Sequence, residues 1–380
     1  MKLLIFSPYY PPHTGGLESH ADEFNKYLSQ EGMEITVFTP RFPHDAPEKE
    51  TRHTNVKIIR FPAIEIITNY PVPKFWTARF WQLFSLLFKE DFDIVISRTR
   101  FFLTSLLALI YAKTKRKKWI HIEHGSDFVR LSSNCKTLIA KIYDYTFGCL
   151  VFNLSDQNIS ISKAVQKFVH KFDERESPVI YRGLDIKEID KIQPNLEIRE
   201  KFKNKIIISF VGRLYKWKGV ENSIEAIKSL PQEIKNKIVF LIIGDGEDFS
   251  KLQKMSKDEG CIHMLGNLPR EKAIAILKSA DIYLHSAQPG GGLSTSLLEA
   301  MYCGCAVIAT PNEGADEVIE NNTNGILLKN SNEITEILTN CIGDEPKRKV
   351  FSEKAKQTIR LNFAWNNSIQ KYLGIFKLIK

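Results

Sequence analysis

The stretch "DIYLHSAQPGGGLSTSLLEAMYCGCAVIAT", residues 281–310, contains a complete strand–helix–strand repeat. Its two ends, "DIYLHS" and "AVIAT", are short apolar runs with the length of a buried strand. Three glycines precede the segment between them, in which Leu297, Leu298 and Met301 have helical spacing. Two successive strands joined by a helix lie parallel to each other, so this stretch predicts a parallel sheet with helices packed against it.

The same alternation continues through the rest of the chain and forms two series. The second series holds "KIIISFVG", "KIVFLIIGDG" and "CIHMLG" before the stretch itself, and the first holds "KLLIFS", "EITVFT", "FDIVIS", "KWIHIEH" and "QNISIS". A charged, weakly apolar linker at residues 181–205 separates them. The 380 residues therefore predict an α/β protein of two Rossmann-like, doubly wound domains facing across a cleft, with ligands beyond the carboxyl ends of the strands.

The composition is that of a globular protein with excess positive charge. Hydrophobic residues make up 43% of the chain, the net charge is +9 and the pI is about 9.0. This charge favours a phosphate-bearing ligand or an anionic membrane surface. Nucleic acid is not expected as a partner, because the sequence has no helix-turn-helix, zinc-finger or aromatic RNA-binding motif.

The cysteines and apolar runs bear on localisation. Six cysteines without C-x-x-C pairs are typical of reduced thiols in a cytosolic protein. The apolar start of the chain is soon broken by prolines, and the longest uncharged apolar run, "FFLTSLLALIYA", has 12 residues. A membrane-spanning helix needs about 20. We therefore expect a cytoplasmic protein, with peripheral attachment to the inner face of the cell membrane as a hypothesis.

Three segments place ligand-binding groups at the predicted strand ends. Glycines 15–16 follow the first strand and open a helix whose N–H groups suit a phosphate, although a tight turn explains them equally well. Gly212 ends a strand and is followed by the cations Arg213, Lys216 and Lys218. Two or three cations at this place suit a diphosphate, or they belong to a solvated basic loop. Glu299, in the second turn of its helix, could accept hydrogen bonds from sugar or ribose hydroxyls, or be an ordinary exposed Glu.

These segments resemble glycosyltransferase family 4, whose members are retaining transferases with the GT-B fold. The resemblance rests on "PPHTGGLESH", "EHGSD", "ISKAV", "GRLYKWKG", "GDGED", "LLEAMYCGCAVIAT" and "EVIENNTNGILL", and covers nearly the whole chain. It implies an acceptor-binding domain at residues 1–185, a donor-binding domain at residues 186–355, and C-terminal helices at residues 356–380 that cross back to the first domain.

The family's roles carry over by position. Arg213 and Lys218 would hold the donor diphosphate as it leaves, and His124 would face the donor sugar. Glu299 would bind the nucleotide ribose. The implied donor-binding set is Gly15, Gly16, Gly212, Gly291, Gly292, Leu293, Leu297, Leu298 and Glu299. The resemblance implies no metal and no cofactor, since the nucleotide sugar is a co-substrate.

The sequence departs from the family at one position. The family's acidic pair has the spacing E-x7-E, and eight places before Glu299 stands Gly291. Either the sugar is held by the backbone amides of residues 291–293, or the site has lost activity; the first is favoured because the other site residues are present. The implied reaction moves a sugar from a UDP- or GDP-sugar to a glycan or lipid-linked acceptor in polysaccharide or glycolipid synthesis. A non-catalytic partner subunit and a nucleotide-sugar epimerase are the alternatives.

Two further segments bear on the acceptor and on metal. The aromatic segment 75–92 and the basic run 113–118 could rest on an anionic membrane, although a core-facing helix is slightly favoured for the aromatic segment. "DFD" at residues 91–93 resembles the D-x-D motif of metal-using transferases, but an Asp that leads a strand is the better explanation.

Overall fold

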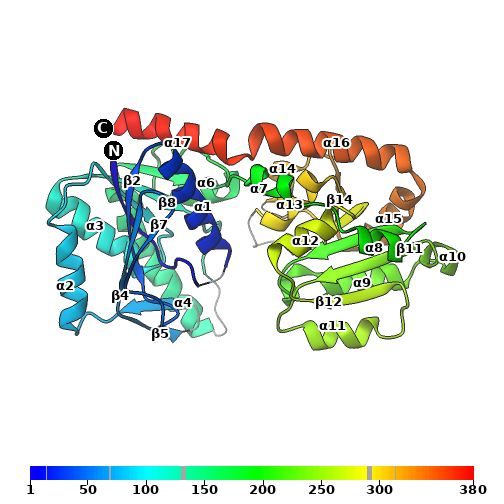
Figure 1. Cartoon of the computed structure of the whole chain (residues 1–380). Coiled ribbons are helices and arrows are strands. Elements are labelled where there is room, and N and C mark those ends of the chain that lie inside the picture. The colour runs from blue at the N-terminus through cyan, green and yellow to red at the C-terminus, as the bar shows by residue number, and fades with distance from the viewer. Residues whose placement is uncertain (14, 68–69, 130–133, 289–292, 313) are drawn as a thin grey trace. The chain divides into compact units, whose positions relative to one another are not determined.

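The computed structural model describes residues 1–13, 15–67, 70–129, 134–288, 293–312 and 314–380. These form two compact units, coloured mainly blue to green and green to orange in Figure 1. Unit 1 comprises residues 1–183 and 365–380, and unit 2 comprises residues 184–364. Each unit is built on a parallel sheet with helices packed against it, so the predicted fold class is confirmed.

Unit 1 contains a seven-stranded sheet of order β3-β4-β2-β1-β7-β8-β9, in which only the β3–β4 pair is antiparallel. Its strands are β1 (Lys2–Phe6), β2 (Glu34–Pro40), β3 (Lys49–Arg52), β4 (Val56–Phe61), β7 (Ile94–Arg98), β8 (Lys118–Glu123) and β9 (Gln157–Ser160), with a separate hairpin of β5 (Ala63–Ile67) and β6 (Tyr70–Pro73). Its helices are α1 (Gly16–Gln30), α2 (Ala78–Leu87), α3 (Leu103–Lys115), α4 (Asn134–Tyr143), the π-helical turn η1 (Asp144–Gly148), α5 (Cys149–Leu154), α6 (Lys163–Val169) and α17 (Trp365–Ile379).

Both faces of the unit 1 sheet are buried, because successive side chains of β1 point to opposite sides. Leu3 and Ile5 lie in one core with α1 and α17, while Leu4 and Phe6 lie in the other with α2 and α3. Helix α17 contributes Trp365, Ile369, Tyr372 and Phe376 to the first core. The last residues of the chain are therefore part of the same folding unit as the first.

Unit 2 contains a six-stranded parallel sheet of order β12-β11-β10-β13-β14-β15. Its strands are β10 (Ile206–Val211), β11 (Ile238–Ile243), β12 (Ile262–Gly266), β13 (Ile282–His285), β14 (Ala306–Ala309) and β15 (Ile326–Leu327). Its helices are α7 (Ile186–Lys191), α8 (Leu196–Lys201), η2 (Lys216–Lys218), α9 (Val220–Lys228), α10 (Gln232–Lys235), α11 (Phe249–Ser256), α12 (Arg270–Leu277), α13 (Thr295–Cys303), α14 (Ala315–Val318), η3 (Ser331–Glu333), α15 (Ile334–Gly343) and α16 (Glu345–Asn362).

Several details refine the sequence-based expectations. Residues 356–364 group with unit 2, because residues 356–362 continue α16, which packs on α13 and β14. The helix expected from about Leu293 begins at Thr295. In α2 the side chains of Phe80 and Phe84 are buried in the core, so the core-facing interpretation of this helix is confirmed. Among the described residues, no helix combines the length and the hydropathy needed to cross a bilayer.

Candidate functional site

The donor-site residues expected in unit 2 lie at the carboxyl ends of two neighbouring strands. Gly212 and Arg213 directly follow β10, and α13 follows β13, which pairs in parallel with β10. Gly291 and Gly292, between β13 and α13, lie outside the described residues. Leu293 is half-buried and immediately precedes Ser294, the N-cap of α13. The geometry therefore brings the basic loop and the start of α13 to one edge of the sheet, where ligands of such sheets bind.

The loop after β10 is fixed tightly to the loop after β13. Gly219 has a φ of +64°, and a Cβ at this position would collide with the carbonyl oxygen of Ser286. Ser286 Oγ donates to the Gly219 carbonyl at 2.7 Å, and the Gln288 N–H donates to the Trp217 carbonyl at 2.8 Å. Lys218 is thus held beside the end of β13 by contacts of its two neighbours, and not by its own side chain.

This edge of the sheet carries a concentration of positive charge. Arg213 is exposed and Lys218 is half-buried, with its Nζ 4.4 Å from the centroid of the Trp217 ring. Burial, and then the charge of Arg213, lower the pKa of Lys218 to about 8. Burial and the charge of Lys218 lower the pKa of His285, at the end of β13, to about 3, so this imidazole is neutral. A bound anion would relieve the repulsion between the two cations.

Helix α13 carries the remaining donor-site residues. Leu297 and Leu298 are completely buried, so only their backbone could contact a ligand. The Leu298 N–H already donates to the Ser294 carbonyl at 3.2 Å, whereas the N–H of Leu297, in the first turn, has no intrahelical acceptor by helix geometry. Of the two, Leu297 is therefore the better candidate for an amide contact to phosphate.

Glu299 is buried and paired with a cation that the sequence analysis missed. Arg270, the first residue of α12, places both Nε and Nη2 at 2.8 Å from Glu299 Oε1. The pairing fixes the carboxylate in one orientation. Nothing in the spacing of residues 270 and 299 indicates the contact, since it depends on the packing of α12 against α13.

His124, the catalytic candidate of unit 1, directly follows β8 and stands against His20 of α1. The two rings are perpendicular, with centroids 4.9 Å apart. Burial, and then the charge of Arg98, lower the pKa of His124 to about 3. His124 Nε2 is buried and has no hydrogen-bond partner in the part of the chain that the structure describes. The imidazole is therefore neutral, and one of its ring nitrogens makes no hydrogen bond to the described residues.

The loop that bears His124 is built on buried ion pairs. Glu123 Oε1 accepts from the N–H groups of His124 and Gly125 at 3.0 and 2.6 Å. Arg100 donates from Nη1 to Glu123 and, through Nε and Nη2, to Asp144 of η1, each at 3.0 Å. Although Glu123 is buried, the charge of Arg100 holds its pKa well below the usual range. The sequence motif "EHGSD" thus contains a positioning carboxylate next to the candidate histidine.

The glycines at the start of α1 lie close to a second cation of unit 1. Gly15 is the N-cap of α1 in an extended conformation, and Gly16 is its first residue. Arg182 donates to the Gly16 carbonyl at 3.1 Å and to Ser19 Oγ at 3.0 Å. Within unit 1 the start of α1 therefore lies beside Arg182, another positive group that the sequence analysis did not single out.

The aspartates of the D-x-D-like segment have structural partners. Asp93 Oδ2 accepts from the Lys2 N–H at 2.8 Å, which joins the start of β7 to β1, and Asp91 pairs with Lys117 at 2.6 Å. In the described ranges, no three His, Cys, Asp or Glu side chains are grouped as metal ligands.

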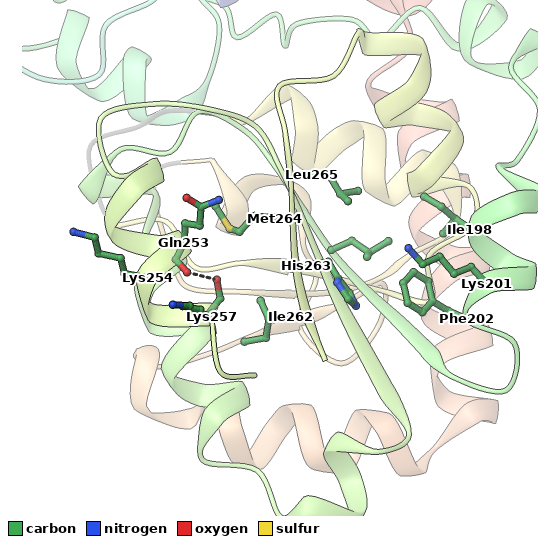
Figure 2. Close-up of a pocket in the computed structure, with 12 residues that line it drawn as sticks. Ile198, Lys201, Phe202, Gln253, Lys254, Lys257, Ile262, His263, Met264 and Leu265 are labelled. Atoms are coloured by element: carbon green, nitrogen blue, oxygen red, sulfur yellow. Dashed lines mark hydrogen bonds between the residues drawn. The ribbon is translucent and has the colours of Figure 1, made fainter. Parts of the chain in front are cut away.

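A hollow of about 580 Å³ in unit 2 lies elsewhere, along the edge strand β12 (Figure 2). Lys254 and Lys257 line it on one side of the strand, and Lys201 and Phe202 on the other. It contains none of the expected donor-site residues. The hollow is therefore not the expected nucleotide site. Lysines beside an edge strand, as here, commonly prevent the strand from pairing with another chain.

Comparison with known proteins identifies the family. Residues 192–358 match the model of the glycosyl transferases group 1, and residues 14–188 match that of Glycosyltransferase Family 4. An "Uncharacterized glycosyltransferase" of Methanocaldococcus jannaschii is 49% identical over 386 residues, covering 99% of this chain and 98% of the relative.

Two more distant relatives carry specific names. The gpi3 subunit of phosphatidylinositol N-acetylglucosaminyltransferase from Schizosaccharomyces pombe is 23% identical, covering 95% of this chain and 77% of that protein. Anabaena HepE, solved in complex with UDP, has the same fold, with a TM-score of 0.74 at 18% identity over 99% of this chain and all of that one. The chain therefore belongs to the group 1 glycosyltransferases and has their GT-B fold.

Proposed function

We propose that this glycosyltransferase moves a hexosyl group from a UDP- or GDP-sugar to a glycan or lipid-linked acceptor, with retention at the anomeric carbon and without a metal. The observation that carries the proposal is the edge of the unit 2 sheet, where Arg213 and Lys218 stand at the end of β10 and α13 begins beyond the adjacent β13. Two cations and a helix N-terminus at neighbouring strand ends suit a diphosphate.

The proposed chemistry rests on charge stabilisation at the leaving diphosphate. If the leaving phosphate oxygen takes the proton of the acceptor hydroxyl, no side-chain base is required, and the cations act by stabilising the departing charge. Glu299, paired with Arg270, would accept hydrogen bonds from the ribose. His124 is suited to hydrogen bonding with the sugar, and not to proton transfer, because its pKa is about 3.

The names of two relatives support the choice of donor and acceptor. HepE was solved with UDP, and the yeast relative is named for transfer of N-acetylglucosamine to phosphatidylinositol. For this chain we propose a uridine or guanosine diphosphate donor and an acceptor on a lipid carrier or growing glycan. A cytoplasmic location at the inner membrane face would agree with such an acceptor.

Calorimetry with UDP, GDP, ADP and their common sugar conjugates, with a chelator present, tests the donor site. We expect tight binding of one nucleotide by the wild type and loss of binding in Arg213→Ala/Lys218→Ala. The matched control is Lys216→Ala, which removes an exposed cation from the same turn. No binding of any nucleotide by the wild type would refute the proposal and favour a non-catalytic partner subunit.

Once a donor is found, turnover and stereochemistry test the rest. Loss of Arg213 or Lys218 is expected to lower kcat roughly 100- to 1,000-fold, by analogy with removal of an oxyanion-hole donor. NMR of the first product would show the anomeric configuration of the transferred sugar, and a configuration opposite to that of the donor would refute the retaining mechanism.

A further inference from the structure

The helix formed by α4, η1 and α5 presents an apolar face to solvent. Its described side chains include seven large hydrophobic ones that are 40–62% exposed. They are Leu138, Ile139, Ile142, Tyr145, Phe147, Leu150 and Leu154. We call these seven side chains the apolar face. Single exposed apolar side chains are common on protein surfaces, but a group of them usually marks an interaction surface.

The opposite face of this helix is firmly anchored in unit 1. Ala140, Asp144, Gly148 and Val151 are buried and recur every three or four positions. Asp144 accepts two hydrogen bonds from the buried Arg100, and a Cβ on Gly148 would approach the Arg100 side chain to 3.5 Å. The helix therefore cannot turn its apolar face inward without breaking a buried ion pair.

The only exposed charge on the described part of this helix is positive. Asp144 is the only carboxylate between residues 137 and 154, and it is buried against Arg100. Lys141 is exposed on the helix, with its Nζ 5.1 Å from the Phe128 ring centroid and 6.0 Å from that of Tyr145. Lys171 lies over the same Phe128 ring, at 5.7 Å.

One lysine of the basic run found in the sequence, Lys118, lies near the Leu154 end of the apolar face. Asp156, two residues beyond α5, donates its N–H to the Trp119 carbonyl at 2.8 Å and pairs with Lys118 Nζ at 3.3 Å. Lys118 begins β8 and ends the run of residues 113–118. Lys141 and Lys171 thus lie beside the helix, and Lys118, paired with Asp156, lies near its end.

We infer that the apolar face docks on an anionic lipid surface, with its apolar side chains at the acyl boundary and the lysines at the head groups. A bilayer interface offers both an apolar layer and negative charge. A second copy of this chain fits less well, because a symmetric contact would bring the same cations together with no exposed carboxylate of the helix to pair them. The inference extends the lipid-linked acceptor of the proposed function and assigns the contact to this helix in place of the aromatic segment 75–92.

Vesicle flotation of the full chain tests the inference. The probes are phosphatidylcholine vesicles and equimolar phosphatidylcholine–phosphatidylglycerol vesicles. We expect binding to the anionic vesicles, and a loss of at least roughly tenfold in partitioning for Leu138→Gln/Ile142→Gln/Leu150→Gln. The matched control, Leu196→Gln/Val350→Gln/Leu378→Gln, removes apolar side chains elsewhere that are 47–88% exposed, against 45–59% in the first variant, and should bind like the wild type.

The possible results separate this inference from the proposed function. Calorimetric nucleotide binding and thermal melting of each variant report folding and the donor site independently of vesicles. The inference is overturned if the first triple variant binds vesicles as well as the wild type does. It is also overturned if the wild type binds neutral vesicles as well as anionic ones, or binds neither kind. A wild-type dimer in sedimentation that the same triple variant turns into a monomer would also overturn it, by assigning the apolar face to self-association.

Discussion

Nucleotide binding to unit 2 is expected to weaken above pH 8, because Lys218 must be protonated to hold a diphosphate. In the free protein the pKa of Lys218 is about 8, lowered by burial and by Arg213. A bound diphosphate favours the charged ammonium and so raises this pKa. The affinity is therefore highest at and below about pH 7, and it falls as the pH rises through 8, the pKa of Lys218 in the free protein.

The size of the effect follows from the two pKa values. If the diphosphate restores the pKa of an ordinary lysine, roughly 10.4, the dissociation constant increases about tenfold between pH 7 and pH 9. Binding should also take up about 0.5 proton at pH 8 and close to one proton at pH 9 by the same linkage. Calorimetry in buffers of different ionisation enthalpy measures both quantities.

The control for this prediction is Lys218→Arg, whose guanidinium stays protonated over the whole range. We expect its pH profile to be flat between pH 7 and pH 9, even if its affinity is lower. A tenfold decrease that persists in this variant, or a wild-type affinity independent of pH, would refute the assignment of Lys218 to the diphosphate.

Three other substitutions test the contacts that position the candidate residues of unit 2 and of the His124 loop. Arg270→Ala is expected to weaken nucleotide binding about as much as Glu299→Gln, roughly tenfold, because the carboxylate loses the partner that orients it; titration calorimetry of both variants decides this. Arg100→Met should lower the free energy of unfolding by about 3–5 kcal/mol in urea titrations, since it removes the buried cation that pairs with both carboxylates; a change below 1 kcal/mol would contradict the ion-pair geometry. Gly219→Ala should lower the melting temperature and weaken nucleotide binding, because of its φ of +64° and the collision with the next loop, whereas Gly260→Ala, where a Cβ has open space, should change neither.

The alternation of apolar runs and amphipathic segments was sufficient to predict the two sheets. A strand buried on both faces must be apolar along its whole length, so runs such as "KIVFLIIGDG" are visible without any contact information. The basic loop at Arg213 could be placed at a strand end for the same reason. Helix α2 was harder, because its aromatic side chains suit either a membrane or a core, and only the packing of Phe80 and Phe84 decides between them.

The residues that position the candidate site residues could not be predicted, because they contact partners that are distant in the sequence. Arg270 reaches Glu299 from a different helix, and Arg100 joins Glu123 to Asp144 through buried bonds between three segments. The apolar face was also hidden in the sequence. Its helix carries apolar residues on the buried side as well, so the hydrophobic pattern does not indicate which side is exposed.

The position of α17 has a consequence for the order in which the chain acquires its structure. Residues 365–380 supply Trp365, Ile369, Tyr372 and Phe376 to a core whose other buried members lie between residues 3 and 180. Unit 2, by contrast, is one uninterrupted segment. During synthesis from the N-terminus, unit 2 can therefore fold as soon as it emerges, while unit 1 waits with part of its core uncovered until α17 has been made. Of the two units, the one whose synthesis starts earlier is completed later.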